Sequence, residues 1–457
     1  MNTASQSTPN TEATANTESN NTSFFASLME KLFKLKAHNT NIKTEVTAGI
    51  TTFVTMAYIL FVNPDIMSIA GMDYQAVFVA TALSAAIGCI FMGLYANWPV
   101  GLAPGMGLNA FFTFAVVKGM EYSWQVALGA VFISSVVFVI MSVTKLRSWI
   151  IDSIPTSLRY AMTAGVGLFL GIIGLKAAGI ITASPATLVT MGDFHDPKVV
   201  LGALSFLIIA VLASRKVFGS VLIGIIIVTA ISTLMGLVSL PEQAVSLPTG
   251  LSKTFMQMDV VGALDLSMVS IILAFLFVNM FDTAGTMIGV ADSANFYNKE
   301  GKINNLNKAL TADSVASVAG AVIGCPPVTT YVESNAGIAE GGRTGLTAVI
   351  VGLLFLVAMF FAPIAQIVPG YATAGALIYV AFLMVGSLSK VNWNEFTDYV
   401  PAAITAIMMP LTYSIADGII LGFLSFTIIK HATGRSKDVS LGMNVLTIVF
   451  IAKLIFI

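Results

Sequence analysis

Trp98-Pro-Val-Gly-Leu-Ala-Pro-Gly-Met-Gly-Leu-Asn-Ala-Phe-Phe112 is an apolar stretch that one continuous helix cannot pass through. Pro99 and Pro104 each remove a backbone donor, and the glycines beside them weaken a helix further. At membrane depth, interrupted backbone is tolerated only where protein, water or a ligand satisfies its polar groups. The stretch is therefore predicted to line a cavity.

A second stretch, in the other half of the chain, repeats this pattern: Gly324-Cys-Pro-Pro-Val-Thr-Thr-Tyr-Val-Glu-Ser-Asn-Ala-Gly-Ile-Ala-Glu-Gly-Gly-Arg-Thr-Gly345. It combines Pro326 and Pro327 with a cluster of glycines. Two such interrupted segments at matching positions of two halves indicate the binding site of a secondary transporter. The alternative is that the glycines only allow close helix packing.

The composition predicts an all-α polytopic membrane protein. Hydrophobic residues make up 56% of the 457 residues and charged residues only 10%, whereas soluble domains carry about 25% charged residues. The lipid bilayer is therefore the expected surroundings. Cys89 and Cys325 lie in apolar segments, so neither a disulfide framework nor a metal site is expected. No basic patch for nucleic acid stands out, and no cofactor is predicted.

Apolar stretches near or beyond the roughly 20 residues that cross a bilayer as a helix recur along the chain. The predicted spans are 46–63, 75–97, 102–117, 124–143, 157–178, 199–213, 217–238, 267–290, 308–324, 326–342, 345–367, 372–388, 399–414 and 416–430. Seven spans per half, an odd number, would make the halves inverted repeats. The last apolar segment, Leu441–Ile457, contains Lys453 and leaves both a further span and an interfacial helix open.

The basic residues predict the orientation. With the N-terminus in the cytoplasm, only Lys118, Lys176, Lys198 and Lys253 fall on the opposite face, with Lys453 in the last apolar segment. All other Lys and Arg residues then lie on the cytoplasmic side, as the positive-inside rule requires. We expect a multi-pass protein of the cell (inner or plasma) membrane.

The first 45 residues are expected to lie outside the bilayer core. Residues 1–23 are rich in Asn, Thr and Ser, contain no Lys or Arg, and are predicted to form a disordered polar tail. In residues 24–45, apolar residues such as Leu28 and Leu32 recur at helical spacing, and lysines lie between them. This amphipathic segment is predicted to lie on the cytoplasmic membrane surface.

Two of the carboxyl groups inside the predicted spans are candidates for function. Asp282 lies in a long apolar span, where burial costs several kcal/mol unless the group is paired, protonated or wetted, so it is a candidate proton carrier. Thr286 shares its helix face. Glu333 follows the Pro-Pro break, where it could accept N–H bonds from a planar ligand. Alternatively, the hydroxyl of Thr283 or Thr286 caps the Asp282 carboxylate. For Glu333, the alternative is a helix cap or a structural partner of Arg343.

Other polar residues near the spans are assigned structural roles. Asp65, Asp313 and Asp417 are predicted to be capping residues, and Glu340 with Arg343 a cytoplasmic turn and ion pair. An aromatic ligand could stack on one of several rings, although each is more often core. These are Phe53, Tyr58, Phe111, Phe112, Phe281 and Tyr331.

Four stretches together resemble a known family. They are Gly101-Leu-Ala-Pro-Gly-Met-Gly-Leu-Asn-Ala-Phe-Phe112, Met280-Phe-Asp-Thr-Ala-Gly-Thr-Met-Ile-Gly289, Thr329-Thr-Tyr-Val-Glu-Ser-Asn-Ala-Gly337 and Glu340-Gly-Gly-Arg-Thr-Gly-Leu346. They resemble the azaguanine-type adenine/guanine/hypoxanthine permeases of the nucleobase cation symporter superfamily, of the xanthine/uracil permease type. The resemblance runs from about Leu35 to the C-terminus.

The resemblance implies fourteen spans in two inverted repeats of seven, with short β-strands in the broken spans 3 and 10. It further implies a core domain, 46–143 and 267–367, and a gate domain, 144–266 and 368–430, followed by a C-terminal loop and apolar segment, 431–457. Substrate would lie between the strands. The site residues that the resemblance and the pattern predict are Asp282, Glu333, Thr286, Tyr331, Asn109, Ala110 and Phe281.

These implications predict import of purine nucleobases by proton symport, with Asp282 or Glu333 carrying the proton. Guanine and hypoxanthine present adjacent donors and acceptors in one plane, which a carboxylate and strand-end N–H groups can match. Sodium coupling and a homodimer stay open. Cys325-Pro-Pro327 departs from the Ser/Thr-rich run expected there, which leaves the preferred purine open.

Several other functions remain as alternatives. One is a uracil, xanthine or anion carrier of the same architecture. The remote ones are an intramembrane enzyme or a channel. The chain contains only three histidines, none in a zinc-protease or Ser-His pattern, so we expect no enzyme.

Overall fold

The computed structural model describes residues 26–144, 153–241, 243–297 and 302–456. The predicted polar tail, the first two residues of the amphipathic segment, and Lys145 and Arg147 lie outside the described residues. The remainder of the amphipathic segment includes a helix over residues 26–33. Phe33 and Leu35 pack on Leu346, which attaches this segment to the start of a later helix.

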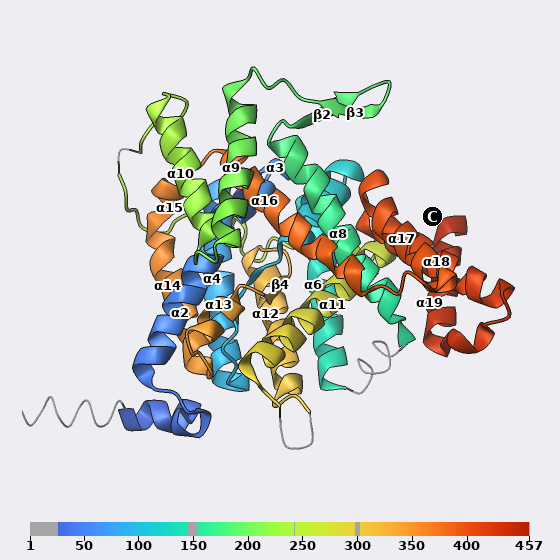
Figure 1. Cartoon of the computed structure of the whole chain (residues 1–457), viewed down its shortest axis with the longest axis horizontal. Helices are drawn as coiled ribbons and strands as arrows, with labels where there is room; N and C mark the ends of the chain where they lie inside the picture. Colours follow the sequence, from blue (N-terminus) through green and yellow to red (C-terminus); the bar gives the residue numbers. More distant parts are fainter. Residues whose placement is uncertain (1–25, 145–152, 242, 298–301, 457) are drawn as a thin grey trace, which may run out of the picture.

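Helices account for most of the described chain (Figure 1). The first half contains α2 (Ile42–Met56), α3 (Ile59–Ile69), α4 (Tyr74–Phe91), α5 (Met106–Ala110), a π-helical continuation (Phe111–Gly119), α6 (Trp124–Val143), α8 (Thr156–Ala177), α9 (Pro197–Ser214) and α10 (Ser220–Leu234). The second contains α11 (Val269–Ala294), α12 (Leu306–Ile323), α13 (Ser334–Ala339), α14 (Gly345–Ala358), α15 (Ala362–Ala365), α16 (Gly370–Val385), α17 (Phe396–Leu411), α18 (Ile415–Ala432) and α19 (Leu441–Phe456).

Many of these helices can cross a bilayer. Within the described residues, 9 helices are long and apolar enough to do so by length and composition. Shorter apolar helices cover 106–119, 220–234, 396–411 and 441–452. The chain is therefore a polytopic membrane protein, as the composition predicted, whereas the number of fourteen spans stays a prediction.

Both broken segments contain a short strand, as expected. β1 (Leu102–Pro104) pairs antiparallel with β4 (Val328–Thr330), and Ala103 lies opposite Thr329. A second hairpin, β2 (Ile181–Ser184) with β3 (Leu188–Met191), projects from the connection between α8 and α9 (Figure 1). The sequence pattern does not predict this exposed hairpin, because its strands are short and contain no long apolar run.

The helices pack in two groups. In one group, α14 packs on α2 and α4, and α12 packs on α4 and α6. In the other, α16 packs on α8 and α9, and α17 packs on α8 and α18. Figure 1 shows α2, α4 and α14 on the opposite side of the molecule from α17, α18 and α19. The broken segments with β1 and β4 lie between these groups.

The C-terminal helix α19 runs antiparallel to α18. The Phe423 and Phe450 rings meet edge to face with centroids 5.5 Å apart, and the hydroxyls of Thr427 and Thr447 lie 2.8 Å apart. The apolar segment that the sequence left open is therefore a helix docked on the last predicted span.

Three structural roles predicted from the sequence are wrong. Asp313 lies inside α12, fully buried, and its Oδ2 accepts a hydrogen bond from Thr283, so it caps no helix. Asp65 lies inside α3 and accepts one from Thr373. The guanidinium of Arg343 donates to the carbonyls of residues 338 and 342 instead of pairing with Glu340. Proximity along the chain suggested caps and a pair, but each side chain faces another element.

The position predicted for Asp417 at a helix end is confirmed. Asp417 lies in the first turn of α18, where Ser414 is the N-cap residue and its hydroxyl accepts from the Asp417 N–H.

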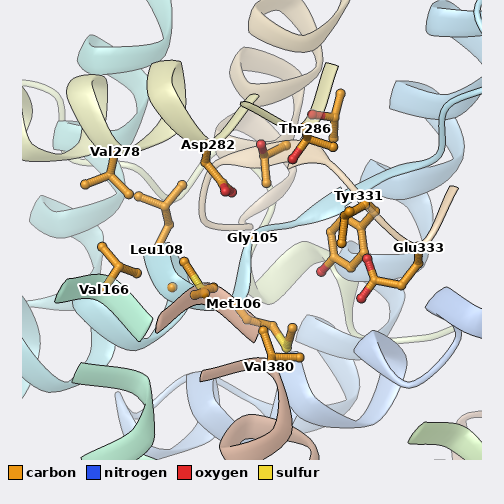
Figure 2. A pocket seen from close by; sticks show the side chains of 15 residues that line it. Gly105, Met106, Leu108, Val166, Val278, Asp282, Thr286, Tyr331, Glu333 and Val380 are labelled. Atoms are coloured by element: carbon orange, nitrogen blue, oxygen red, sulfur yellow. The ribbon is translucent and has the colours of Figure 1, made fainter. Parts of the chain in front are cut away.

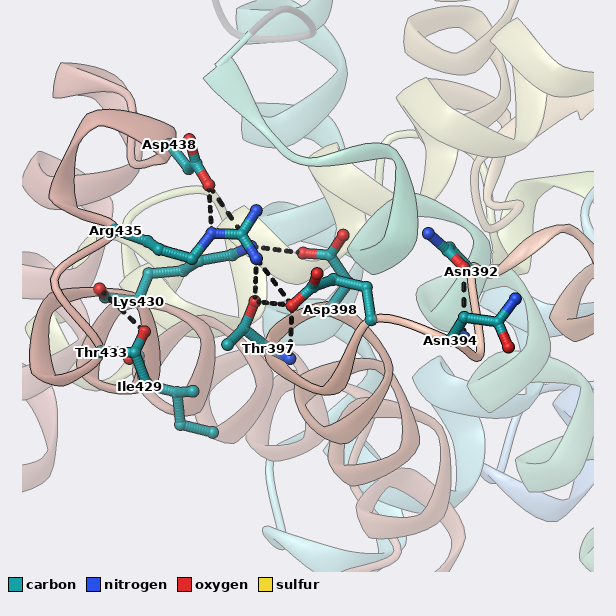
Figure 3. Close-up of polar contacts among 10 residues, drawn as sticks. Asn392, Asn394, Thr397, Asp398, Ile429, Lys430, Thr433, Arg435 and Asp438 are labelled. Carbon is teal, nitrogen blue, oxygen red and sulfur yellow. Dashed lines mark hydrogen bonds and ion pairs between the residues drawn. The ribbon is translucent and has the colours of Figure 1, made fainter.

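Charged residues at one end of α17 and α18 form a network (Figure 3). The ammonium of Lys430, whose side chain is 2% exposed, lies 2.7 Å from Asp398 and 3.7 Å from Asp438. Arg435 contacts Glu395 at 2.6 Å and Asp438 at 2.8 Å. Hydrogen bonds from Thr397 and Arg435 hold the pKa of Glu395 below its usual range. The network joins α17 to α18 and to the turn before α19.

Lys430→Met should lower the stability of the protein, because Asp398 would lose its buried cation. Breaking a buried pair from one side costs about 3 kcal/mol, at the low end of such losses because Asp398 is partly exposed. The measurement is the Tm of the purified protein in detergent. Lys437→Met, at an exposed position in the turn before α19, is the control. Equal Tm values for the two variants would contradict a stabilising role for the network.

Candidate functional site

The two broken segments meet through backbone hydrogen bonds at the centre of the molecule. Beyond the β1–β4 ladder, the Gly105 N–H donates to the Pro327 carbonyl and the Tyr331 N–H donates to the Gly101 carbonyl, both at 3.0 Å. Each interrupted segment thus satisfies the other's backbone, as a water-poor environment requires. The pairing places the residue after each strand at one cavity.

Gly105 allows the two strands to approach this closely. A Cβ atom built there would lie 2.7 Å from Cγ2 of Thr329, closer than side-chain carbons pack. Helical structure resumes directly afterwards, with α5 on one segment and α13 on the other. The two helices therefore begin close to the strand pair, and the first N–H groups of α13 donate to the carbonyls of residues 331–333.

The cavity beside the strand pair is lined from three directions. Figure 2 shows Asp282 reaching it from α11, and Tyr331 and Glu333 from the segment after β4. The lining residues are Gly105, Met106, Gly107, Leu108, Val166, Val278, Asp282, Thr286, Thr329, Thr330, Tyr331, Val332, Glu333, Val380 and Met384. Most of them are apolar, and two are acids. Such a site suits a flat, largely apolar ligand with a few polar groups.

Glu333 is held by a tyrosine from α2–α3. The Tyr58 hydroxyl donates to Oε1 of Glu333 at 2.6 Å, and Tyr58 itself is fully buried. The Tyr331 hydroxyl donates in turn to the Pro104 carbonyl at 2.6 Å, which fixes its ring beside the strand pair. These bonds orient one carboxylate and one aromatic ring on the same side of the cavity.

Asp282 faces the same cavity without a protein partner. Among the described residues, none donates a hydrogen bond to its carboxyl group, and no cation pairs with it. Thr286, one turn further along α11, also lines the cavity. The alternative that Thr283 caps Asp282 does not hold, because the Thr283 hydroxyl bonds to Asp313 and lies 2.9 Å from the Thr329 hydroxyl.

A buried polar network supports β4 from behind. Thr283 connects Asp313 to Thr329, and the Ser317 hydroxyl donates to the Val328 carbonyl at 2.5 Å. Oδ1 of Asp313 is buried and has no hydrogen-bond partner among the described residues. The sequence analysis missed this carboxyl as part of the site region, because its partners come from α11 and β4, far apart in sequence.

The predicted site residues separate into two sets. Asp282, Thr286, Tyr331 and Glu333 line the cavity together. Three others do not line it and are buried. These are Asn109, Ala110 and Phe281. The Nδ2 of Asn109 donates to Asn63, and the Phe281 ring centroid lies 6.4 Å from that of Phe277.

Most apolar lining residues were missed by the sequence analysis. Met106 and Leu108 follow β1, whereas Val166, Val380 and Met384 come from α8 and α16 of the other helix group. Periodicity cannot single out such residues, because every face of these helices is apolar. The Tyr58 contact to Glu333 was also unpredictable, since Tyr58 was only one of several aromatic candidates.

A second cavity adjoins the other side of Glu333. It is lined by Thr55, Tyr379 and Glu333 together with the connection between α9 and α10 around Lys216 and Phe218. Glu333 therefore lies between the two cavities, and a ligand leaving the first toward this connection would pass it.

Comparison with known proteins assigns the chain to a family. Residues 43–421 match a permease family of the xanthine/uracil type. The chain belongs to this permease family. It is 49% identical over 430 residues to the adenine permease AdeP of Escherichia coli (strain K12), covering 94% of this chain and 96% of the relative. It is 44% identical over 440 residues to the guanine/hypoxanthine permease PbuG of Bacillus subtilis (strain 168), covering 94% and 100%.

These relatives confirm the resemblance that the four sequence stretches carried. They are permeases, so the expectation that this chain is a transporter rather than an enzyme is also confirmed. The transmembrane domain of the cyanobacterial bicarbonate transporter BicA has the same fold, with a TM-score of 0.62 over 84% of this chain and 97% of that one. At 17% sequence identity, this permease shares with it the fold alone.

Gly105→Ala should destabilise the permease, because the added Cβ would push β1 and β4 apart. Overpacking of this kind costs about 1–3 kcal/mol. The free energy of unfolding in detergent is the measurement. Gly289→Ala, inside α11 with open space around the added atom, is the control and should be neutral or stabilising. Equal destabilisation of both variants would show that strand approach is not the cause.

Proposed function

We propose that the permease imports purine nucleobases. The observation that carries the proposal is the cavity in which Asp282 and Glu333 lie with Tyr331 beside the paired strands. The relatives named as adenine and guanine/hypoxanthine permeases align along almost the whole chain, which supports a purine as the substrate. The preferred base, among adenine, guanine and hypoxanthine, is for experiment to decide.

The cavity chemistry fits a purine edge. A carboxylate can accept two N–H bonds from guanine or hypoxanthine, and the Thr286 hydroxyl can either donate or accept. The Tyr331 ring offers a face for stacking. The base would not contact three of the predicted site residues, Asn109, Ala110 and Phe281. Asn109 supports the cavity lining through its bond to α3, and the other two support it by packing.

We further propose that a proton is the coupling ion. Asp282 has no protein cation or donor beside it within the described chain, so a proton would relieve the cost of its burial. Glu333, which accepts from Tyr58, is better prepared to stay ionised and hold the base. Sodium is the alternative ion, although the described residues contain no group of three or more acids, histidines or cysteines positioned around a metal.

The transport cycle proposed here is alternating access. The core domain, 46–143 and 267–367, would carry the base past the gate domain, 144–266 and 368–430. The two packing groups of helices support this division. The proposal includes fourteen spans in inverted repeats, a cytoplasmic N-terminus and a position in the cell membrane. A homodimer is compatible with this cycle but is not required by it.

Uptake of labelled adenine, hypoxanthine, guanine and uracil into cells that lack their own base permeases tests the substrate. We expect saturable uptake of at least one purine and none of uracil, and a protonophore should abolish accumulation. Uptake of uracil alone would favour the alternative carrier of the same architecture. Purine uptake that requires sodium and resists the protonophore would contradict proton coupling.

Asp282→Asn and Glu333→Gln should each lower purine uptake at least 100-fold, because each removes a charge from the cavity while keeping the side-chain shape. Tyr58→Phe should lower it about tenfold, since one hydrogen bond to a charged group is lost. Glu340→Gln, at an exposed position after α13, is the matched control and should transport normally. The amount of each variant in the membrane must equal that of the wild type. Normal uptake by both acid variants would refute the site.

A further inference from the structure

A single side-chain hydrogen bond joins α3 of one helix group to α16 of the other. The hydroxyl of Thr373 lies 2.7 Å from Oδ2 of Asp65, and Thr373 is 3% exposed. Asp65 lies near the C-terminal end of α3, and Thr373 lies in the first turn of α16. The bond therefore crosses the seam between the two groups, beside the connections at residues 70–73 and 366–369.

We propose that Asp65 and Thr373 form a latch that holds the permease closed on the side away from the cytoplasm. Asp65 is then a positioning residue for transport, because it acts on the relative placement of the two helix groups and does not touch the base. This inference rests on the proposed function in assuming that these groups move past each other and that the N-terminus is cytoplasmic.

The two cavities place the latch on the closed side. The cavity beyond Glu333 reaches Lys216 and Phe218, in a connection that the basic residues assign to the cytoplasmic side. Both α2–α3 and α16 extend from that side to the Asp65–Thr373 contact. The Asp65–Thr373 contact thus lies at the end of the seam opposite the cytoplasmic cavity. A latch that keeps the inward-open form closed to the outside has to lie at that end.

The hydroxyl chemistry explains why an acceptor oxygen is needed at position 65. Thr373 has one hydroxyl proton, and its oxygen lies 2.7 Å from Oδ2 of Asp65 and 2.9 Å from the Gly370 carbonyl. The hydroxyl can donate to either of these two acceptors. An asparagine at position 65 keeps a side-chain oxygen that can accept this bond, whereas alanine does not.

The same short helix also contacts the broken segment beside the substrate cavity. Two residues before Asp65, Asn63 donates to Thr81 of α4 and accepts from Asn109 of α5, both at 2.7 Å. Asn109 directly follows Leu108, which lines the cavity. A shift of α5 when a base binds would therefore be passed through α3 to the latch, which gives a physical route from occupancy to closure.

Thr373→Val and Asp65→Ala should release the latch and raise the outward-open fraction. The apparent KM for external purine should fall, by up to about tenfold, because the apparent affinity scales with the fraction of protein in the competent state. The maximal rate should change less than KM. Asp65→Asn should behave like the wild type, because its amide oxygen can accept from Thr373. An unchanged KM in both latch variants would overturn the proposal.

Ser205→Ala is the matched control. It removes a buried 2.7 Å bond from the Ser205 hydroxyl to the Ala372 carbonyl, one residue from Thr373 but within one helix group. Its KM should stay at the wild-type value. The double variant Asp65→Ala/Thr373→Val should match the single variants, since both remove the same bond. A fall in KM with Ser205→Ala, or additive effects in the double variant, would count against a latch.

Amide hydrogen exchange of purified protein without substrate tests the latch independently of the transported base. Exchange over residues 59–69 and 370–376 should become several-fold faster in Thr373→Val and Asp65→Ala, and not in Asp65→Asn. Unchanged exchange would overturn the latch even if purine uptake is normal. Faster exchange with no uptake of any base by the wild type would support the latch and refute only the proposed substrate.

Discussion

The pairing of β1 with β4 is the constraint on which the rest of the structure depends. Each strand belongs to a segment in which proline and glycine prevent a continuous helix, and neither segment could satisfy its backbone alone in a membrane. Antiparallel pairing of Leu102–Pro104 with Val328–Thr330 satisfies both at once. Because these segments come from opposite halves of the chain, the pairing also brings the two halves together.

The site follows from this pairing. Residues directly after β1 and β4 must lie side by side, which places Met106 and Leu108 near Tyr331 and Glu333. Helix α11 adds Asp282 from a third direction, and the network through Thr283 and Asp313 ties that helix to β4. A carboxyl at Asp282 can therefore act on the same ligand as Glu333 although 50 residues of chain separate them. Glu333 accepts from Tyr58, whereas Asp282 has no donor or cation beside it within the described chain, so its desolvation has to be offset by a ligand, a proton or water.

The sequence predicted the parts of this arrangement that depend on local chemistry. Proline and glycine predicted both breaks, and isolated acids in apolar spans predicted Asp282 and Glu333 as cavity residues. It could not predict contacts between elements. Asp65 and Asp313 were interpreted as caps because they lie near polar neighbours in sequence, whereas their partners, Thr373 and Thr283, come from other helices. The lining residues Val166 and Val380, from α8 and α16, could not be predicted either, because apolar residues occur on every face of these helices.

Asn109 illustrates how a residue can support a cavity without lining it. It occupies the position after Leu108, but its amide is used by Asn63, which also binds Thr81. The hydrogen-bonded series Asn109–Asn63–Thr81 ties α5 to α3 and α4, although Oδ1 of Asn109 is buried without a partner among the described residues. In the proposed alternating-access cycle, the seam that opens and closes would lie between α3 and α16, where Asp65 and Thr373 form a polar contact.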